Sequence, residues 1–343
     1  MHKNIKVLSL EELEQVLDRW QQPRFHARQI FSWIYKKGVM DFERMSNLPL
    51  TLRNRLKDNF SLFDLRLVEI LKSQDGTQKF LFALGDGNLI EAAIIPVERR
   101  ITGCISTQVG CKFACRFCAS GLLGFKRNLS SSEMLDEVLY LKNNSKSHKL
   151  THLVFMGMGE PLDNYTYVLK AIRMINSPYA LNMGARRMTI STCGIIPGIK
   201  RLSTEGLQIE LSISLHAADD KTRSLLMPIN KKYPLKALIE SSKDYIKKTN
   251  RQITFEYILI KDINSDLQSA QNLIKILRGL NCKINLIPCN LIKEYNIEPP
   301  NKLETLLFRD CLIKGGLNVT LRRPRGQDIA AACGQLRLRY AQK

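Results

Sequence analysis

Short apolar strands alternate with amphipathic helices from about residue 100 onward, and this alternation restricts the fold more than any other feature. Seven candidate strands lie at 101–106, 151–157, 187–192, 209–217, 253–260, 282–288 and 317–323. Helical patterns lie between them, for example at 130–144, 166–176, 234–248 and 266–280. Such alternation predicts parallel βαβ units. We expect an α/β protein with a full or partial (β/α) barrel, whose chemistry lies at the C-terminal ends of the strands.

The residues before the barrel have a different pattern. Ser9 and Glu12 form a capping-box signature ahead of a helical apolar period, and two further helical segments follow. The pairs Asp75-Gly76 and Asp86-Gly87 then separate apolar runs, which is a strong hairpin signal. The predicted organisation is a helical domain (1–62), a β-hairpin linker region (63–96), the barrel (97–326) and a C-terminal tail (327–343).

Cys111, Cys115 and Cys118 form a C-x₃-C-x₂-C motif in the loop after the first barrel strand. Three thiolates at this spacing can hold three irons of a [4Fe–4S] cluster, which leaves the fourth iron for the methionyl amino and carboxylate groups of S-adenosylmethionine (SAM). The alternative is a zinc knuckle with Cys104 or a histidine as fourth ligand. Zinc sites usually carry two separated cysteine pairs, so the spacing favours the cluster.

The loop after the next strand reads Gly157-Met158-Gly159-Glu160-Pro161. Glycines at a strand end let the backbone approach a ligand closely, and Glu160 can accept a hydrogen bond from a ligand ammonium group. A tight turn between a strand and a helix would have the same sequence. One βα unit after the cysteines, however, this loop lies where the methionyl amino group of SAM needs partners.

Three later strand ends are polar, and their hydroxyl, backbone and amide groups could hold the carboxylate and ribose of SAM. Each could equally be a strand-end cap or turn residue. Position alone does not make His216 a catalytic base. The residues are Ser191, Ser214, Leu215, His216 and Asn290.

The chain of 343 residues carries 52 Lys and Arg against 32 Asp and Glu, a net charge of +20. Arginine clusters such as Arg99-Arg100 and Arg186-Arg187 favour RNA as the partner, because neutralised phosphates release counterions. A lysine-rich proteome with basic surfaces is the alternative. Nine cysteines without an export signal or a long apolar run predict a cytoplasmic protein with no membrane segment.

Taken together, these motifs resemble the RlmN/Cfr family of radical SAM RNA methyltransferases. The amino-terminal stretch FHARQIFSWIYKKGVMDFERMSNLP is similar to the helical accessory domain of that family, and the resemblance implies that residues 1–62 bind RNA. The resemblance covers nearly the whole chain, through the stretches LIEAAIIP, CISTQVGCKFACRFCASGLLGFKRNL, FMGMGEPLDN, ISTCGIIPGI, SLHA, LMPIN and RGQDIAAACGQL.

The resemblance implies a role for each site residue. It makes Cys111, Cys115 and Cys118 the cluster ligands, and Cys333 the cysteine that becomes S-methylated. Cys104 would resolve the intermediate through a transient disulfide with Cys333, and Glu91 would accept a proton. The pattern alone suggests only an exposed strand carboxylate at Glu91. The implied SAM contacts are Gly159, Glu160, Ser191, Ser214, Leu215, His216 and Asn290.

The implied reaction is methylation of adenine C2 with two SAM per turnover. One SAM methylates Cys333, and a second yields the radical that activates this methyl group for addition to C2. The implied substrates are one adenosine of 23S rRNA and the adenosine 3′ of the anticodon in some tRNAs. The enzyme is expected to act as a monomer with an electron donor such as flavodoxin or ferredoxin.

Three alternatives remain from the sequence. The Cfr branch methylates C8 of adenine, whereas Pro161 and the stretch RRPRGQDI resemble the C2 branch. An activase of a glycyl-radical enzyme would share the cluster motif but would need neither Cys333 nor Cys104. A zinc-containing RNA-binding module would have no catalytic activity. The segment 291–302 departs from the Pro/Gly-rich loop of the family, so no substrate contact is carried over to it.

Overall fold

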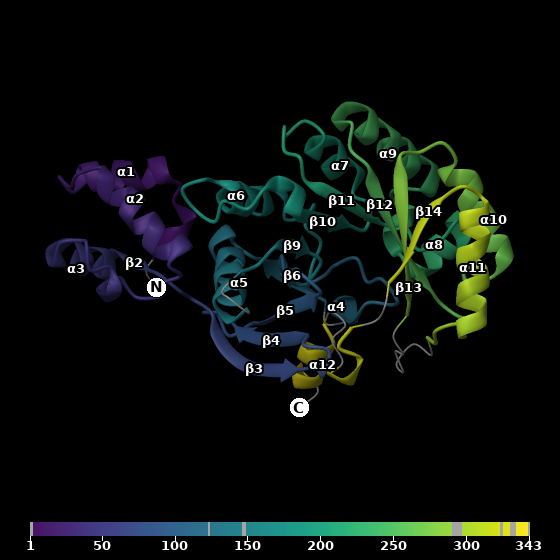
Figure 1. The fold of residues 1–343 in the computed structure, drawn as a ribbon, viewed down its shortest axis with the longest axis horizontal. Coiled ribbons are helices and arrows are strands. Elements are labelled where there is room, and N and C mark those ends of the chain that lie inside the picture. The colour runs from purple at the N-terminus through teal and green to yellow at the C-terminus, as the bar shows by residue number, and fades with distance from the viewer. Residues whose placement is uncertain are drawn as a thin grey trace.

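The computed structural model describes residues 3–122, 124–145, 149–289, 297–322, 325–329 and 334–341. Asn290 and Cys333, both singled out from the sequence, lie outside these ranges. A small helical unit at the N-terminus stands beside a larger α/β body (Figure 1).

The N-terminal unit confirms the predicted capping box. The Ser9 hydroxyl accepts from the Glu12 backbone N–H at 3.1 Å, and the Glu12 carboxylate accepts from the Ser9 N–H at 2.6 Å. Fully buried Leu13, Leu17 and Ile30 form part of its core. Its elements are β1 (Lys3–Asn4), η1 (Ile5–Val7), α1 (Leu10–Arg19), α2 (Phe25–Phe31), η2 (Ser32–Lys36), η3 (Phe42–Arg44), α3 (Leu50–Asn59) and β2 (Phe60–Ser61).

The predicted hairpins form an antiparallel meander of β3 (Arg66–Lys72), β4 (Gln78–Ala83) and β5 (Leu89–Val97). Strand β5 also pairs antiparallel with β6 (Arg100–Cys104). The meander therefore continues the main sheet instead of forming a separate layer.

The main body contains all seven predicted barrel strands. Each pairs in parallel with its neighbour, in the order β6-β9-β10-β11-β12-β13-β14. Because β14 and β3 form the edges of this sheet in the described part of the chain, the barrel is partial. After β6, the strands are β9 (His152–Phe155), β10 (Met188–Thr192), β11 (Glu210–Ser214), β12 (Ile253–Leu259), β13 (Cys282–Pro288) and β14 (Asn318–Leu321).

Helices connect these strands, with the predicted segments each forming one helix. None of the helices in the described ranges combines the length and apolar character needed to cross a membrane. The connecting elements are α5 (Ser131–Asn144), α6 (Tyr165–Asn176), η5 (Ala185–Arg187), α7 (Ile196–Leu202), α8 (Asp220–Leu226), η6 (Pro228–Lys231), α9 (Leu235–Thr249), α10 (Leu267–Leu277) and α11 (Lys302–Lys314).

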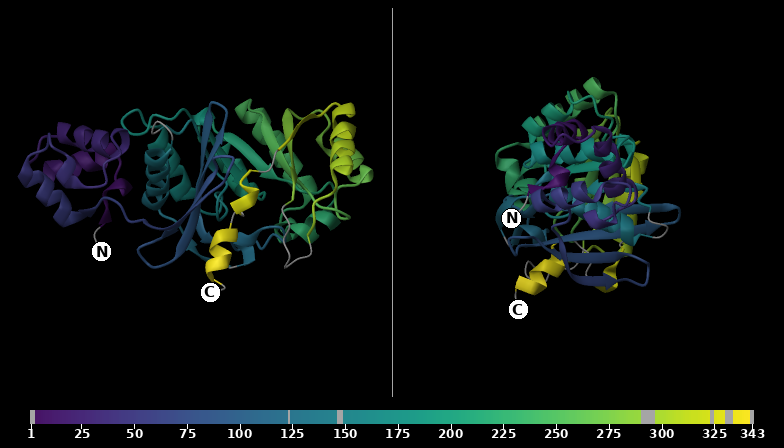
Figure 2. Two further views of the ribbon diagram at one scale, coloured as in Figure 1. Left: turned by 60° about the horizontal axis from the view of Figure 1, so that its bottom comes forward. Right: turned by 90° about the vertical axis from the view of Figure 1, so that its left-hand side faces the viewer.

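Two features around the barrel were not predicted. Strands β7 (Gln108–Gly110) and β8 (Phe125–Asn128) form a small antiparallel pair, and the cysteine motif lies between them with α4 (Ala119–Leu122). The tail contains η8 (Gln327–Ile329) and α12 (Gln335–Ala341), and α12 packs against β5 and α4. Figure 2 shows α12 beside the meander strands, far from α11 in space.

A buried ion pair joins the N-terminal unit to the barrel. The Lys6 ammonium lies 2.7 Å from a carboxylate oxygen of Asp136 on α5, and neither side chain is exposed. Lys6 also donates to the carbonyl oxygen of Leu62. Removal of one partner from such a pair leaves an uncompensated buried charge.

We therefore expect Asp136→Ala to lower the free energy of unfolding by about 3–5 kcal/mol, measured by denaturant titration. Asp18→Ala, which breaks an exposed pair with Arg24, is the control and is expected to change stability little. The double variant Lys6→Met, Asp136→Leu should recover most of the loss. Equal effects of Asp136→Ala and Asp18→Ala would contradict this role of the pair.

Candidate active site

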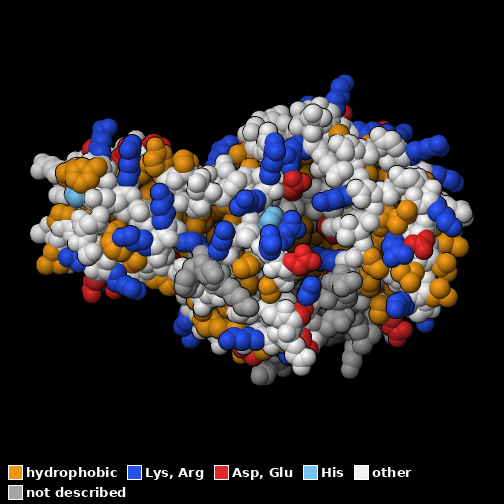
Figure 3. Space-filling model, in the orientation of Figure 1, with side chains coloured by type: hydrophobic (Ala, Val, Ile, Leu, Met, Phe, Trp, Pro, Cys, Tyr) orange, Lys and Arg blue, Asp and Glu red, His pale blue; other side chains and the backbone are white. Residues whose placement is uncertain are grey.

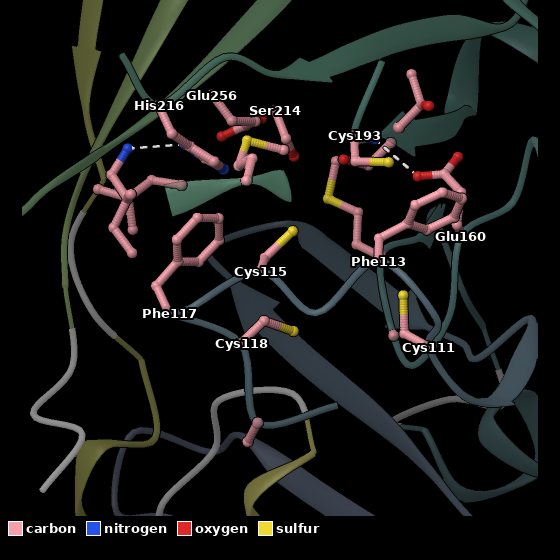
Figure 4. Close-up of a pocket in the computed structure, with 18 of the residues that line it drawn as sticks. Cys111, Phe113, Cys115, Phe117, Cys118, Glu160, Cys193, Ser214, His216 and Glu256 are labelled. Carbon is pink, nitrogen blue, oxygen red and sulfur yellow. Dashed lines mark hydrogen bonds between the residues drawn. The ribbon is translucent and has the colours of Figure 1, made fainter. Parts of the chain in front are cut away.

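A cavity of about 300 Å³ lies at the C-terminal ends of the barrel strands. Phe155, Thr192, Ser214 and Pro288, which end β9, β10, β11 and β13, contribute to its wall. Figure 4 shows the cysteine loop on one side of this cavity and the strand ends on the other. Eight of the predicted site residues line it, namely Cys111, Cys115, Cys118, Gly159, Glu160, Ser191, Ser214 and His216.

The three cysteines of the motif direct their sulfur atoms into this cavity (Figure 4). Burial raises the pKa of the Cys111 thiol to about 12, and it raises the pKa of Cys115 well above its usual value. Thiolates are the usual ligands of a cubane cluster, so three thiols that face one cavity are a donor set that fits such a cluster, which would displace the thiol protons on binding.

The glycine loop packs unusually close to the segment after β6. A Cβ atom at Gly157 would lie 2.6 Å from the carbonyl oxygen of Ile105, and one at Gly159 would lie 2.5 Å from Gln108 Cβ. Gly159 also has φ = +100°. Glycine is therefore required at 157 by space and at 159 by both space and backbone conformation. The approach that the structure shows is to the chain itself, whereas the predicted approach to a ligand remains a prediction.

Glu160 is buried between the ends of β9 and β10. One carboxylate oxygen accepts from the Cys193 backbone N–H at 2.7 Å, and the other accepts from the Leu162 N–H at 3.0 Å. Burial raises the pKa of Glu160, although these hydrogen bonds act against the rise. An ammonium group bound in the cavity would be a favourable partner for this carboxylate.

Gln108 on β7 fixes the position of the glycine loop, and no sequence pattern pointed to it. Its side-chain oxygen accepts from the Glu160 backbone N–H at 2.9 Å. Its amide nitrogen donates to Asn128 and Asp163, both at 2.8 Å. One buried amide therefore connects the β7–β8 pair to the loop that carries Glu160.

The β11 strand end places its three predicted residues differently. Ser214 and His216 line the cavity, whereas Leu215 is fully buried and contributes backbone groups. The Leu215 N–H donates to the carbonyl oxygen of Glu256 at 3.0 Å. His216 Nδ1 accepts from the Ile258 N–H at 3.0 Å, so its proton is on Nε2.

Arg223 on α8 is a further residue that the sequence patterns did not reveal. Its guanidinium is completely buried and donates to the carbonyl oxygens of Cys193 at 2.9 Å, Leu215 at 3.1 Å and Ser214 at 3.2 Å. It thus holds the segments after β10 and β11 together. Ser214 is the last residue of β11, and Cys193 and Leu215 directly follow β10 and β11, so Arg223 binds carbonyl groups at the strand ends.

Glu256 on β12 also faces the cavity (Figure 4). One oxygen accepts from Ser212 and Asn285, both at 3.1 Å, while the other has no hydrogen-bond partner among the described residues. A carboxylate in an otherwise apolar strand was a signal available in the sequence.

Glu91 and Cys104 lie on the adjacent strands β5 and β6, and neither is among the residues that line the cavity. Because Ala93 pairs with Cys104, and side chains alternate along a strand, Glu91 and Cys104 share one face of the sheet. Glu91 is only 3% exposed and lies 3.0 Å from the Lys79 ammonium, so the strand pattern was wrong to suggest an exposed carboxylate. Its two oxygens accept from the backbone N–H groups of Gly334 at 2.7 Å and Arg337 at 2.6 Å.

Comparison with known proteins gives consistent results over the whole chain. Residues 105–274 match the radical SAM superfamily, and residues 3–62 match the ribosomal RNA large subunit methyltransferase N-terminal domain. The chain is 45% identical over 339 residues to the probable dual-specificity RNA methyltransferase RlmN of Clostridium novyi, covering 98% of both proteins. A protein of the same description from Thermoanaerobacter sp. is 44% identical over 338 residues, again covering 98% of both. The crystal structure of a radical SAM methyltransferase from Sphaerobacter thermophilus superimposes with a TM-score of 0.95 at 40% identity, covering 97% of this chain and 98% of that one.

The close approach at Gly159 leads to the first prediction for the site. We expect Gly159→Ala to lower the free energy of unfolding by about 2–4 kcal/mol and to weaken SAM binding, because the new methyl group displaces Gln108. Gly279→Ala is the matched control, because Gly279 has φ = +76° but a Cβ atom there would have no heavy atom within 4 Å. Calorimetric SAM titration and chemical denaturation test both variants. Equal losses in both would attribute the effect to backbone conformation alone.

The second prediction concerns His216. Burial, together with the positive charge of Arg223, lowers its pKa from 6.5 to about 3. The unfolded chain takes up this proton below pH 6.5 and the folded protein does not, so stability is lost as the pH falls from 6.5 towards 3. Ring ¹⁵N shifts should show a neutral imidazole throughout that range, and His216→Gln should flatten the corresponding part of the stability profile. A ring that titrates near its ordinary pKa would refute the prediction.

Proposed function

The chain belongs to the RlmN family of radical SAM RNA methyltransferases, and from this membership we propose that it methylates C2 of adenosine in RNA. The proposed targets are one adenosine of 23S rRNA and the adenosine 3′ of the anticodon in some tRNAs. The observation that carries the proposal is the contact of Glu91 with Gly334, the residue that follows Cys333. It joins the strand that bears the proposed proton acceptor to the tail that bears the proposed methyl carrier.

The residues around the cavity suit the cofactors of this reaction. Cys111, Cys115 and Cys118 would hold a single [4Fe–4S] cluster, and Glu160 would accept from the amino group of SAM. Ser191, Ser214, Leu215, His216, Gly159 and Asn290 would complete the SAM site. When bound, the cluster and SAM supply the methyl group and the radical that activates it.

A cysteine that carries the methyl group is needed because adenine C2 cannot be methylated directly by SAM. C2 of adenine is an electron-poor amidine carbon, so it does not attack the methyl group of SAM as a nucleophile. In the proposed sequence, the Cys333 thiolate would take a methyl group from one SAM, and that methyl group would lose one hydrogen atom to the radical derived from a second SAM. Cys333 would deliver the resulting one-carbon unit to C2, Glu91 would accept the C2 proton, and one electron would return to the cluster. The Cys104 thiolate would then attack the Cys333 sulfur, so that an S–S bond forms as the S–C bond breaks, and the released carbon would take up a proton to become the methyl group of the product.

Charge supports RNA as the substrate. The net charge is +20, and Figure 3 shows Lys and Arg side chains across both the N-terminal unit and the barrel. Phosphate neutralisation would provide a large part of the affinity and would make it salt-dependent. We propose that the enzyme acts as a monomer in the cytoplasm and takes electrons from a donor such as flavodoxin or ferredoxin.

Pro161 supports C2 over C8 as the methylated position. The GEPL sequence that contains it and the stretch RRPRGQDI at 322–329 resemble the C2 branch of the family. The target position therefore rests on sequence resemblance, and it is decided by the methylated nucleoside that the enzyme produces.

The direct test is nucleoside analysis of rRNA and tRNA from cells with and without the gene. We expect 2-methyladenosine to disappear from 23S rRNA and from the tRNA pool when the gene is removed, and plasmid-borne wild-type protein to restore it. Cys333→Ala should not restore it. A change in 8-methyladenosine instead would overturn the C2 assignment, and unchanged RNA would overturn the proposal.

The cysteine mechanism has its own test. Mass spectrometry of cluster-replete protein should show a methyl group on Cys333, and Cys104→Ala should accumulate a covalent adduct between protein and RNA. Cys311→Ala is the matched control, because that cysteine lies on α11, which packs against α10 and the edge strand β14, whereas Cys104 lies on β6. Release of free methylated RNA by Cys104→Ala at the wild-type rate would exclude the resolving role.

A further inference from the structure

The segment that precedes Cys333 is fixed to the turn between β3 and β4. One carboxylate oxygen of Asp328 accepts from the Ser73 hydroxyl at 2.6 Å, and the other accepts from the Gln74 backbone N–H at 3.1 Å. In return, Asp75 of the turn accepts from the Gly326 N–H at 3.0 Å. The turn thus donates to a carboxylate of the tail, and the tail donates to a carboxylate of the turn. We call this set of contacts the turn anchor.

The turn is built to receive the tail. Asp75 accepts from the Thr77 N–H at 2.9 Å through its other oxygen, and the Ser73 hydroxyl accepts from the Asp75 N–H at 3.3 Å. These local bonds fix the side chains that meet the tail before any contact with it forms. The hydrogen bonds from Ser73 and Gln74 also lower the pKa of Asp328, so the carboxylate stays ionised at neutral pH.

The segment that follows Cys333 is held at a second point, by Glu91. Gly334 and Arg337 donate their backbone N–H groups to its two oxygens, at 2.7 Å and 2.6 Å. Gly334 also lies against α4, since a Cβ atom there would be 2.5 Å from the backbone nitrogen of Ser120. Ser120 comes two residues after Cys118.

The Glu91 contacts and the turn anchor differ in whether they can stay intact during a reaction. Glu91 is the proposed proton acceptor, and it is 3% exposed while Gly334 and Arg337 cover it. An RNA base that reaches Glu91 must compete with these contacts. The turn anchor contains no proposed catalytic group and lies on the surface, where Asp328 is exposed. It can therefore persist when the Glu91 contacts change.

We propose that Ser73, Asp75 and Asp328 are positioning residues, which keep the tail docked so that Cys333 meets both its methyl donor and the RNA base. The proposal rests on the proposed function, because it takes Cys333 as the methyl carrier. Its physical basis is effective concentration: a tail held on both sides of the reactive residue loses far less entropy on reaching each partner than a tail held on one side. These residues are not expected to change the affinity for RNA, since they act only on the position of Cys333.

Asp328→Ala tests the proposal in anaerobically reconstituted full-length enzyme. The loss of two hydrogen bonds should reduce the rate of RNA methylation about tenfold and leave the KM for RNA unchanged. 5′-Deoxyadenosine is the product that the second SAM leaves after it activates the methyl group. The ratio of 5′-deoxyadenosine formed to methyl groups transferred to RNA should rise, because a poorly positioned Cys333 would be activated without reaching the base. Hydrogen exchange of peptides that cover 334–341 should become faster.

Two further variants make the result specific. In Asp328→Asn the amide can accept from Gln74 N–H and donate to the Ser73 hydroxyl, so rate and protection should return close to wild type. Asp310→Ala removes a surface carboxylate from α11 and should behave as wild type. Wild-type rate together with wild-type exchange in Asp328→Ala would overturn the proposal. If wild-type enzyme leaves RNA and Cys333 unmethylated, the proposed function fails, while the exchange measurement still decides whether the anchor holds the tail.

Discussion

Strand β6 is hydrogen-bonded on both edges, and the arrangement of the site depends on this double pairing. It runs antiparallel to β5 on one side and parallel to β9 on the other. The first pairing sets Cys104 beside Ala93, on the face that also carries Glu91. A shift of one residue would turn one of these side chains to the opposite face. The Ser106 hydroxyl extends the link beyond the strand, because it donates to the Glu91 carbonyl at 2.6 Å and accepts from the Met158 N–H at 3.0 Å.

Buried polar side chains fix the loops that follow the strands. Arg223 satisfies carbonyl groups after β10 and β11, and Glu160 accepts from backbone N–H groups on two segments. A buried charge without such partners would cost several kcal/mol, because it would lose its hydration without replacement. The site is therefore held in place by the chain's own contacts at positions where a cofactor would otherwise have to order it.

The sequence predicted the features that depend on local patterns. The barrel strands are apolar runs between helices, and the capping box of Ser9 and the two Asp-Gly turns involve neighbouring residues. Features that depend on distant partners could not be predicted in this way. The contact of Gln108 with Glu160 spans 52 positions, and that of Glu91 with Gly334 spans 243. The burial of Glu91 thus comes from the tail and leaves no trace in the pattern of β5. The β7–β8 pair was missed because its strands are too short to show a period.

Three glycines allow close backbone contacts around the candidate site. Gly157 and Gly159 let the loop after β9 approach the segment after β6, and Gly334 lets the tail approach α4. At each position a single Cβ atom would lie within 2.8 Å of a backbone atom of the facing segment. These contacts hold the loop after β9 against the segment after β6, and they hold the tail that reaches Glu91 against α4, which follows the cysteine motif. The proposed carrier Cys333 must reach both its methyl donor and the RNA base. A few residues of chain span only a short distance, so the two partners must lie close together. Hence the glycines set how closely the loop, the tail and the cysteine motif approach one another, in addition to the SAM contact proposed for Gly159 and the hydrogen bond that Gly334 donates to Glu91.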